Sequence, residues 1–309
     1  MEMSLAVKHD DGATARMHVP VMVAEVRDLL CAHGPRVVVD ATLGTGGHAA
    51  AMLEATQARL IGLDRDTDAL AVARERLAAF GDRATLRHAD FGQIAEVVRD
   101  CGVEAADAIL ADLGMSSFAL DDSERGFSFR FEGPLDMRMD RSQQLRAYDL
   151  VNEDSEADLA DILHRWGEER AARRIARSIV EARRRRPIET TGELRAIVER
   201  VLGPRRGGGV HPATRTFQAL RIAVNREMES LAGFLASAPG LLSAGGRLAV
   251  IAYHSLEDRA VKERMRELAR TDDYKAITRK VMKPSDAEVA SNPRARSARL
   301  RCLEREMVQ

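Results

Sequence analysis

The chain has 309 residues, of which 45% are hydrophobic, enough for one large domain or two unequal ones. Its net charge of −1 does not mark a nucleic-acid partner, and three widely spaced cysteines without a C-x-x-C pair argue against a disulfide framework or a zinc site. Because no apolar run is long enough for a membrane span and the charged N-terminus does not resemble a signal peptide, we expect a soluble, cytoplasmic protein.

The segment from residue 36 to residue 66 is the most informative. Three consecutive valines predict a buried parallel strand over residues 36–40, followed by a glycine-rich turn that permits close approach to a ligand. A helix is expected over residues 49–56, and Asp64 closes a second strand over residues 60–64. Glycines beneath a ligand and an acid on its ribose hydroxyls are typical of a nucleotide-type site.

Asp40 helps to distinguish between the ligand sites that this arrangement of strands and glycines allows. The pattern Gly44-x-Gly46-x-x-Ala49 also fits a dinucleotide-binding fingerprint, or a glycine turn that binds nothing. An acid four residues before the first glycine is usual in S-adenosylmethionine (SAM) sites and unusual in NAD sites. The segment therefore favours a SAM-dependent methyltransferase, with a dinucleotide enzyme as the alternative.

The next elements continue the alternation of strands and helices. Strands are expected over residues 84–88 and 106–112, and helices over residues 67–80 and 94–100, as in βαβ units.

The next clear parallel strand covers residues 247–253, after a helix over residues 227–237 and a turn at Gly245-Gly246. Roughly 130 residues separate it from the strand before, far more than a crossover needs. We therefore predict an α/β, Rossmann-like fold with an inserted all-helical domain.

Capping signals predict three helices within this insert. The first runs from Ser155 to residue 166, the second covers residues 168–186, and Thr190 opens the third. We place the insert at residues 141–212, so that residues 1–140 and 213–309 form the SAM-binding domain.

Arginine is concentrated in the insert. Residues 164–215 hold 14 arginines, no lysine and 6 glutamates, a local charge of +8 against −9 for the rest of the chain. Arginine without lysine favours planar contact with phosphate or carboxylate. The insert is therefore predicted to recognise the substrate, and a solvated pair of arginine-rich helices is the alternative.

Candidate site residues follow two predicted strands. Ligands of open parallel sheets bind beyond the carboxyl ends of the strands, which puts Asp112 on the substrate side of the cofactor. Asp90 and Phe91, an acid and an aromatic after the strand over residues 84–88, are both expected to flank an adenine ring. The alternatives are that Asp112 only caps the following turn, and that the Asp90-Phe91 pair has no role.

Two later segments have competing interpretations. The cluster from His254 to Arg259 holds a histidine, a serine and two acids, but no G-x-S-x-G elbow exists, so we expect Ser255 to cap a helix. Residues 292–301 contain four arginines, in a solvated tail or in contact with phosphate. Without an H-E-x-x-H or similar motif, no metal is expected.

Motifs over nearly the whole chain carry a family resemblance. They are His18-x-Pro20-Val21-Met22 with Glu25-Val26, Asp40-Ala41-Thr42-Leu43-Gly44-x-Gly46-Gly47-His48, Asp64-Arg65-Asp66, Asp112-Leu113-Gly114-Met115-Ser116-Ser117, Arg125-Gly126-Phe127-Ser128-Phe129, Gly133-Pro134-Leu135-Asp136-Met137-Arg138-Met139-Asp140, Gly167-Glu168-Glu169, His211-Pro212-Ala213-Thr214-Arg215-Thr216-Phe217-Gln218-Ala219-Leu220-Arg221-Ile222, His254-Ser255-Leu256-Glu257-Asp258-Arg259 and Asn292-Pro293-Arg294-Ala295-Arg296-Ser297. On these motifs the chain resembles the bacterial 16S rRNA (cytosine-N4)-methyltransferases, the MraW or RsmH family.

The resemblance implies a cofactor, a partner and a set of contacts. SAM would be the methyl donor, and the substrate a cytosine of the decoding region of 16S rRNA within the small ribosomal subunit, which the helical insert helps to hold. The implied SAM contacts are Gly46, Gly47, His48, Asp64, Phe91 and Asp112.

Asp112 is also the candidate catalytic residue. It is the best-placed acceptor for a hydrogen of the cytosine amine, and the sulfonium of SAM already activates the methyl group, so no metal is required.

Three departures from the family pattern limit what can be carried over. Thr45 stands where the family often has arginine, and Ala252-Tyr253 where it often has Ser-Phe. Ala119 replaces a common glutamine, so one cofactor contact is not carried over.

Two other functions stay open from the sequence. A DNA amino-methyltransferase would carry Pro-Pro-aromatic after Asp112, where this chain has Leu-Gly-Met, so Phe127, Phe129 or Tyr253 would have to supply the missing stacking platform. A catalytically silent RNA-binding module with SAM as a structural ligand is the third hypothesis. The sequence does not decide between a monomer and an oligomer such as a dimer.

Overall fold

The computed structural model describes residues 20–115, 117–203 and 211–307. Within them the α-helices are α1 (Val23–Cys31), α2 (Gly47–Ala55), α3 (Thr67–Leu77), α4 (Ile94–Asp100), α5 (Ser117–Asp121), α6 (Ala147–Glu153), α7 (Glu156–Gly167), α8 (Ala172–Arg183), α9 (Thr191–Leu202), α10 (Thr214–Asn225), α11 (Glu227–Ser237), α12 (Ser255–Leu268) and α13 (Asp286–Ser291). The strands are β1 (Val37–Asp40), β2 (Arg59–Asp64), β3 (Ala84–His88), β4 (Ala106–Asp112), β5 (Leu242–Ala252), β6 (Tyr274–Ala276) and β7 (Arg299–Arg305). The N-terminal segment considered as a signal peptide, His18 and Ser116 lie outside the described residues.

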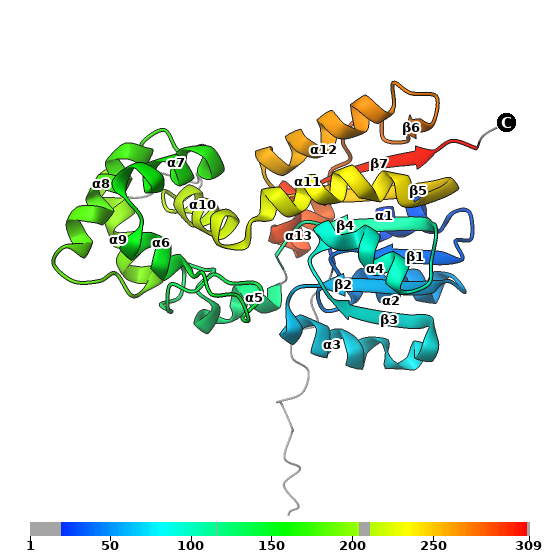
Figure 1. Ribbon diagram of the computed structural model, residues 1–309, viewed down its shortest axis with the longest axis horizontal. Helices are drawn as coiled ribbons and strands as arrows, with labels where there is room; N and C mark the ends of the chain where they lie inside the picture. The colour runs from blue at the N-terminus through cyan, green and yellow to red at the C-terminus, as the bar shows by residue number, and fades with distance from the viewer. Residues whose placement is uncertain (1–19, 116, 204–210, 308–309) are drawn as a thin grey trace, which may run out of the picture.

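All seven of these strands belong to one sheet. Its strand order is β3-β2-β1-β4-β5-β7-β6, with parallel pairing from β3 to β5. β7 pairs with both β5 and β6 in the antiparallel sense. The strand order and the helices between the strands confirm the predicted Rossmann-like α/β fold (Figure 1).

Helices cover both faces of this sheet. On one face, α1, α2 and α3 pack with side chains such as Val38 and Leu60. On the other, α4, α11 and α12 pack with side chains such as Val39 and Ile61. Successive strand residues thus point to opposite buried faces, which explains why these strands read as continuous apolar runs.

The strand prediction was wrong in two details. Gly245-Gly246 is not a turn before a strand but lies inside β5, where Gly245 has φ +77° and the pairing with β4 shifts register. Such an irregularity is a bulge, which glycine favours because it adopts positive φ without strain. The arginines of residues 292–301 do not form a solvated tail, because Arg299 and Arg301 belong to β7.

A second cluster of helices lies beyond the carboxyl ends of the parallel strands (Figure 1). Its hydrophobic core joins α6, α7, α8 and α9 with α10 and with residues before α6 such as Phe127 and Leu135. The cluster is therefore wider than the predicted insert of residues 141–212. We call it the helical part. The division into domains stays a prediction, and this packing favours counting α10 with the insert.

Caps explain where the helices of this part begin. Ser155 accepts the N–H of Asp158 at 3.1 Å, and Thr190 forms a capping box with Glu193, as predicted. α8 is shorter than expected, and Arg183 in its last turn binds the carbonyls of Val151 and Asp154. None of the described helices is long and apolar enough to cross a membrane.

Candidate active site

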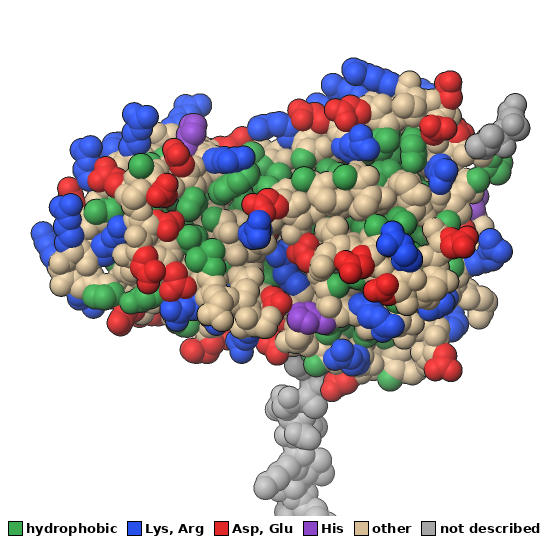
Figure 2. Space-filling view, in the orientation of Figure 1, with side chains coloured by type: hydrophobic (Ala, Val, Ile, Leu, Met, Phe, Trp, Pro, Cys, Tyr) green, Lys and Arg blue, Asp and Glu red, His purple; other side chains and the backbone are tan. Residues whose placement is uncertain are grey.

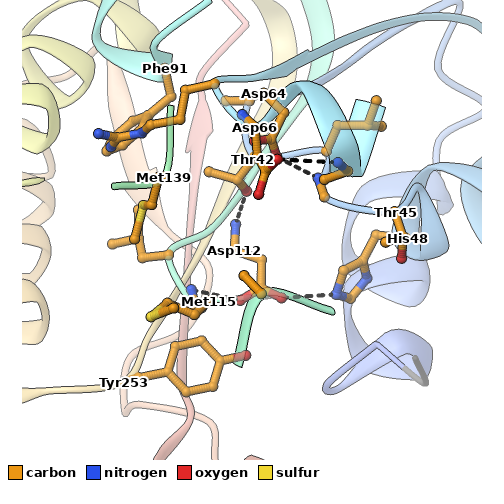
Figure 3. A pocket seen from close by; sticks show the side chains of 18 of the residues that line it. Thr42, Thr45, His48, Asp64, Asp66, Phe91, Asp112, Met115, Met139 and Tyr253 are labelled. Carbon is orange, nitrogen blue, oxygen red and sulfur yellow. Dashed lines mark hydrogen bonds and ion pairs between the residues drawn. The ribbon is translucent and has the colours of Figure 1, made fainter. Parts of the chain in front are cut away.

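A cavity of about 330 Å³ opens where β1, β2 and β4 end. Each of these strands has an aspartate as its last residue: Asp40, Asp64 and Asp112. Five of the predicted site residues line the cavity, namely Gly47, His48, Asp64, Phe91 and Asp112. Figure 3 shows Asp112 near its centre, between His48 and Tyr253.

The glycine turn shapes one wall of the cavity. Gly46 does not line it, but has φ +79° and caps α2, a conformation that costs other residues energy. A Cβ at Gly47 would lie 2.6 Å from Cγ of Pro20, so only glycine fits there. Gly47 therefore lies on the cavity wall, whereas Gly46 supplies the turn before α2, and contact of either residue with SAM stays a prediction.

Asp64 is held in place by the backbone around it. One carboxylate oxygen accepts the N–H of Gly44 at 2.6 Å, and the other accepts the N–H of Asp66 at 2.8 Å. Each oxygen has a second lone pair that can accept a hydrogen bond from a ligand. Burial raises the pKa of Asp64, while those two N–H groups act in the opposite direction.

Phe91 and Asp90 have different roles. Phe91 is buried, packs edge-on against Phe234 with ring centroids 5.7 Å apart, and lines the cavity. The Asp90 side chain instead accepts the N–H of Gly92 at 2.8 Å and the hydroxyl of Ser230 at 2.9 Å. Asp90 is thus a local cap, and only Phe91 of this pair reaches the cavity.

Asp112 has neighbours on three sides. Its N–H donates to the Thr42 hydroxyl at 2.6 Å, which ties the end of β4 to the glycine turn. The N–H of Gly114 lies 3.4 Å from one carboxylate oxygen, and Nε2 of His48 lies 3.5 Å from the other. Both contacts are longer than a usual hydrogen bond. The carboxylate therefore keeps acceptor capacity toward the cavity.

His48 and Asp40 are both buried, and His48 acts electrostatically on the Asp40 carboxyl. Burial raises the pKa of Asp40 to about 7, against the lowering influence of His48 and of the Thr42 N–H. The His48 side chain is buried, and neither of its ring nitrogens has a hydrogen-bond partner among the described residues. A buried polar group without a partner is costly, so His48 is a candidate ligand contact.

The structure separates the three aromatic residues considered as stacking platforms. Phe127 is buried in the core of the helical part, and Phe129 stacks on His211 with centroids 4.6 Å apart. Tyr253 lines the cavity. Among these three, therefore, only Tyr253 reaches the site.

Several cavity residues were missed by the sequence analysis. They are Thr42, Asp66, Met115, Met139, Arg221, Glu227 and Glu257. Arg221 at the end of α10 forms two 2.8 Å hydrogen bonds to Glu227 at the start of α11. All of these residues except Glu227 stand in the family motifs, which were the available signal, whereas the contact between Arg221 and Glu227 depends on tertiary structure.

Glu227, His254 and Glu257 place ligand-type atoms within 4.8 Å of one another, the spacing of a metal site, among the described residues. Both Glu227 oxygens accept hydrogen bonds from Arg221, and Glu257 accepts the N–H of Tyr253 at 2.8 Å and lies 3.1 Å from Nε2 of His254. Nε2 of His254 has no hydrogen-bond partner among the described residues. That the protein needs no metal stays a prediction.

The cap of α12 differs from the prediction. His254, not Ser255, is the N-cap, and its Nδ1 accepts the N–H of Glu257 at 3.3 Å. Ser255 instead donates from its hydroxyl to Glu168, which also pairs with Arg259 at 2.9 Å. Ser255 thus connects the sheet to the helical part.

The C-terminal arginines are largely paired with acids. Asp258 binds Arg299 at 3.1 Å and Arg301 at 2.8 Å, so these two arginines have a structural role. Arg294 reaches the cavity and pairs with Asp121 at 2.6 Å. Phosphate contact by this segment stays a prediction for Arg294 and for the exposed Arg296.

Comparisons with known proteins show the family to which this chain belongs. The model of the MraW methylase family matches residues 15–306. A "Ribosomal RNA small subunit methyltransferase H" from Sorangium cellulosum is 51% identical over 288 residues, which cover 93% of this chain and 90% of the relative. The protein of the same name from Methylobacterium sp. (strain 4-46) is 49% identical over 306 residues, with coverage of 93% and 90%. A solved putative rRNA-methylase from Clostridium thermocellum is 14% identical, covers 92% of this chain and 94% of its own, and has a TM-score of 0.43, too distant to support an argument by itself.

Proposed function

Because this chain belongs to the MraW methylase family, we propose that it transfers a methyl group from SAM to the N4 amine of a cytosine in the decoding region of 16S rRNA. The substrate would be the small ribosomal subunit, in the cytoplasm. The observation that carries the proposal is Asp112, which ends β4 inside a cavity that also holds the glycine turn and Asp64.

The residues of the cavity fit SAM. Asp64 keeps spare lone pairs for two ribose hydroxyls, and Phe91 offers an apolar wall for the adenine. His48, buried without a hydrogen-bond partner among the described residues, can bind a polar group of the ligand. When bound, SAM supplies a methyl group on a sulfonium centre, which needs no further activation.

Asp112 prepares the nucleophile. The exocyclic amine of cytosine is a poor nucleophile, because its lone pair is delocalised into the ring. By accepting a hydrogen bond from this amine, the Asp112 carboxylate turns the lone pair out of the ring plane, stabilises the growing positive charge and takes the proton that the amine loses. The base has to leave its stack to reach this carboxylate, which costs least in single-stranded RNA.

The helical part is the proposed RNA-holding surface. Exposed arginines of α8, α9 and adjoining residues that make no ion pair with a described residue are Arg170, Arg173, Arg174, Arg184, Arg185 and Arg200, of which Arg174 donates to the Val201 carbonyl. Figure 2 shows basic side chains along the outer end of this part. Such unpaired arginines suit contact with phosphates. The basic linker of residues 204–210 lies outside the described residues.

The proposal is tested by methyl transfer from labelled SAM to small ribosomal subunits, followed by mass spectrometry of the nucleosides. We expect N4-methylcytidine, with full activity in EDTA when the subunits are shown to remain intact, and no competition by duplex DNA. Strong competition by duplex DNA would favour a DNA amino-methyltransferase. SAM binding without any transfer would favour a silent RNA-binding module.

A further inference from the structure

One end of the cavity carries polar side chains that the proposed SAM contacts do not use. Asp64 ends β2 and Phe91 follows β3, whereas Glu257 lies in the first turn of α12, directly after β5. In the sheet, β4 lies between β5 and the pair of β2 and β3. Asp112 at the end of β4 therefore stands between the cofactor contacts and the part of the cavity beside Glu257, which we call the β5 end.

Arg221 and Glu227 meet at the β5 end. Glu227 has a carboxylate oxygen within 4.8 Å of ligand-type atoms of both His254 and Glu257. Nε and Nη2 of Arg221 each donate to a different oxygen of Glu227 at 2.8 Å. Both residues line the cavity. Such a forked pair fixes the plane of the guanidinium, and the two charges offset each other.

The Arg221 guanidinium keeps donors for a ligand. Its Nη1 is the one nitrogen of the side chain that makes no hydrogen bond to a described residue, and it is not enclosed by protein. The side chain as a whole is 19% exposed. Because Nη1 carries two N–H groups, Arg221 can remain bound to Glu227 and still donate to a molecule in the cavity.

The end of α10 that carries Arg221 is held in place. The buried side chain of Asn225 accepts the N–H of Met139 at 2.7 Å and donates to the Met137 carbonyl at 2.7 Å. It also donates to the carbonyl of Arg221 itself at 2.9 Å. A donor that is fixed before the ligand arrives loses little conformational entropy on binding, so Arg221 is suited to recognise a group of defined position.

A cytosine whose amine reaches Asp112 would offer Arg221 a matching group. The N4 amine of cytosine is a donor, and the ring nitrogen N3 beside it is an acceptor. An ionised Asp112 can only accept and Arg221 can only donate, so the two side chains together match this edge of the base. Uracil presents the opposite pattern, a carbonyl beside an N3–H. Because Glu227 offsets the charge of Arg221, the pair adds no net positive charge against the one that grows on the amine.

We propose that Arg221 recognises the target base, with Nη1 donating to N3 of the cytosine while Glu227 positions the guanidinium. This inference rests on the proposed function and deepens it, because it names the second group that reads the edge of the base. Arg221 takes no part in the transfer of the proton, which passes from the amine to Asp112.

The test uses small ribosomal subunits reconstituted with either natural 16S rRNA or rRNA that carries 3-deazacytosine at the methylated position. In this analogue a C–H group replaces N3. The variant combines Arg221→Met with Glu227→Gln, which removes the donor without leaving a buried carboxylate unpaired. On natural subunits, the single-turnover rate of methyl transfer should fall by about 10-fold to 100-fold, as expected for the loss of a hydrogen bond to a charged group.

The analogue should abolish this difference between the two enzymes. On 3-deazacytosine subunits, wild type and variant should differ by less than about threefold, because neither can form the bond to N3. Any change in the intrinsic reactivity of the amine is common to both enzymes and cancels in the comparison. Affinity for SAM, measured by calorimetry, should stay within about threefold, since Arg221 lies at the β5 end.

Arg247→Met with Glu304→Gln is the matched control. Nε of Arg247 donates to Glu304 at 2.7 Å between β5 and β7, both side chains are about as buried as those of the first pair, and neither residue lines the cavity. This variant should change neither the rate nor its dependence on N3. If the Arg221 variant is less stable than the control, Arg221→Lys decides, since one ammonium cannot hold Glu227 as a fork and also reach the base.

The outcomes separate this inference from the proposed function. An equal fall on natural and 3-deazacytosine subunits would indicate a structural role and overturn the inference. A wild-type rate on natural subunits, or a large loss of SAM affinity, would also overturn it. If the wild-type protein transfers no methyl group to natural subunits, the proposed function itself fails. If the wild type is active and the Arg221 variants show no dependence on N3, only the inference fails.

Discussion

The cavity and the helical part hold charged side chains in opposite ways. In the cavity, acids are buried and tied to the backbone, as Asp64 is to the N–H groups of Gly44 and Asp66. On the helical part, the side chains of Arg184 and Arg185 are exposed and make no ion pair with a described residue. Carboxylates held in fixed positions suit a small ligand of defined shape. Exposed arginine side chains without ion pairs suit a polyanion such as RNA, which they bind through its charge.

The same contrast occurs within one run of arginines. Arg183 binds the carbonyls of Val151 and Asp154 at the end of α6, and Arg186 pairs with Glu193 at 2.5 Å. Arg184 and Arg185, between them, make no ion pair within the described chain and remain available for an external partner. The run therefore combines structural arginines with two that are candidates for phosphate contact.

The largest effect is expected from Asp112→Asn, which removes the acceptor from the cavity. The single-turnover rate should fall by about 10²–10⁴, the range of a positioned acid or base. Asp28→Asn, in an exposed acid of α1, is the control and should have no effect. A near-wild-type rate would move the role to a backbone carbonyl, since Asp258, an acid in the first turn of α12, is engaged by Arg299 and Arg301.

A smaller effect on stability is expected from Asp40→Asn. Because burial raises the pKa of Asp40 to about 7, the folded protein binds a proton here that the unfolded chain has released above pH 4. Ionising Asp40 therefore costs stability as the pH rises toward 7, and asparagine removes that cost. The gain in unfolding free energy over wild type should increase by about 2–3 kcal/mol from pH 5 to pH 8, measured by urea denaturation.

Asp107 provides a control of opposite sign. Partial burial acts to raise its pKa, but hydrogen bonds from Ser243 and from the N–H groups of Val37 and Arg36 lower it overall. Asp107→Asn should therefore destabilise the protein at pH 7, and this loss should shrink as the pH falls below 4. A gain for Asp40→Asn that is independent of pH would contradict the assignment of a raised pKa.

The smallest effect is expected from Arg184→Gln combined with Arg185→Gln. The slope of log RNA affinity against log salt should fall by about 0.7 for each phosphate that is no longer bound, as for single strands. Arg266→Gln with Arg270→Gln removes equal charge from exposed positions of α12 and the residues after it, and should leave the slope unchanged. An equal change in both variants would mean that only net charge matters.

Local signals determined how much of this structure could be predicted. The bounds of β3, β4 and α4 matched the expectation, because apolar runs and their neighbouring polar residues mark them in the sequence. The glycine turn, Asp64 and Asp112 were also found, since each stands at the end of a strand.

Features that depend on tertiary contact were missed. β7 was missed although its arginines alternate with Leu300 and Cys302, the pattern of a half-buried strand, because the arginines were interpreted only as a solvated tail or as phosphate contacts. The pairing of Arg221 with Glu227, and the packing of α10 with the helical part, likewise follow from how helices meet in space. No pattern within a short window encodes such contacts.

Calorimetric titration with SAM tests the division between the two regions most directly. Three variants should be compared, each checked for wild-type thermal stability: Asp64→Ala, Asp112→Ala, and Arg184→Gln with Arg185→Gln. Asp64→Ala should bind SAM most weakly, because each charge-assisted hydrogen bond to the ribose is worth roughly 1.5–3 kcal/mol. Asp112→Ala should lose less affinity, and the arginine variant should bind like wild type. Near-wild-type affinity in Asp64→Ala, or weakened SAM binding in the arginine variant, would contradict the account.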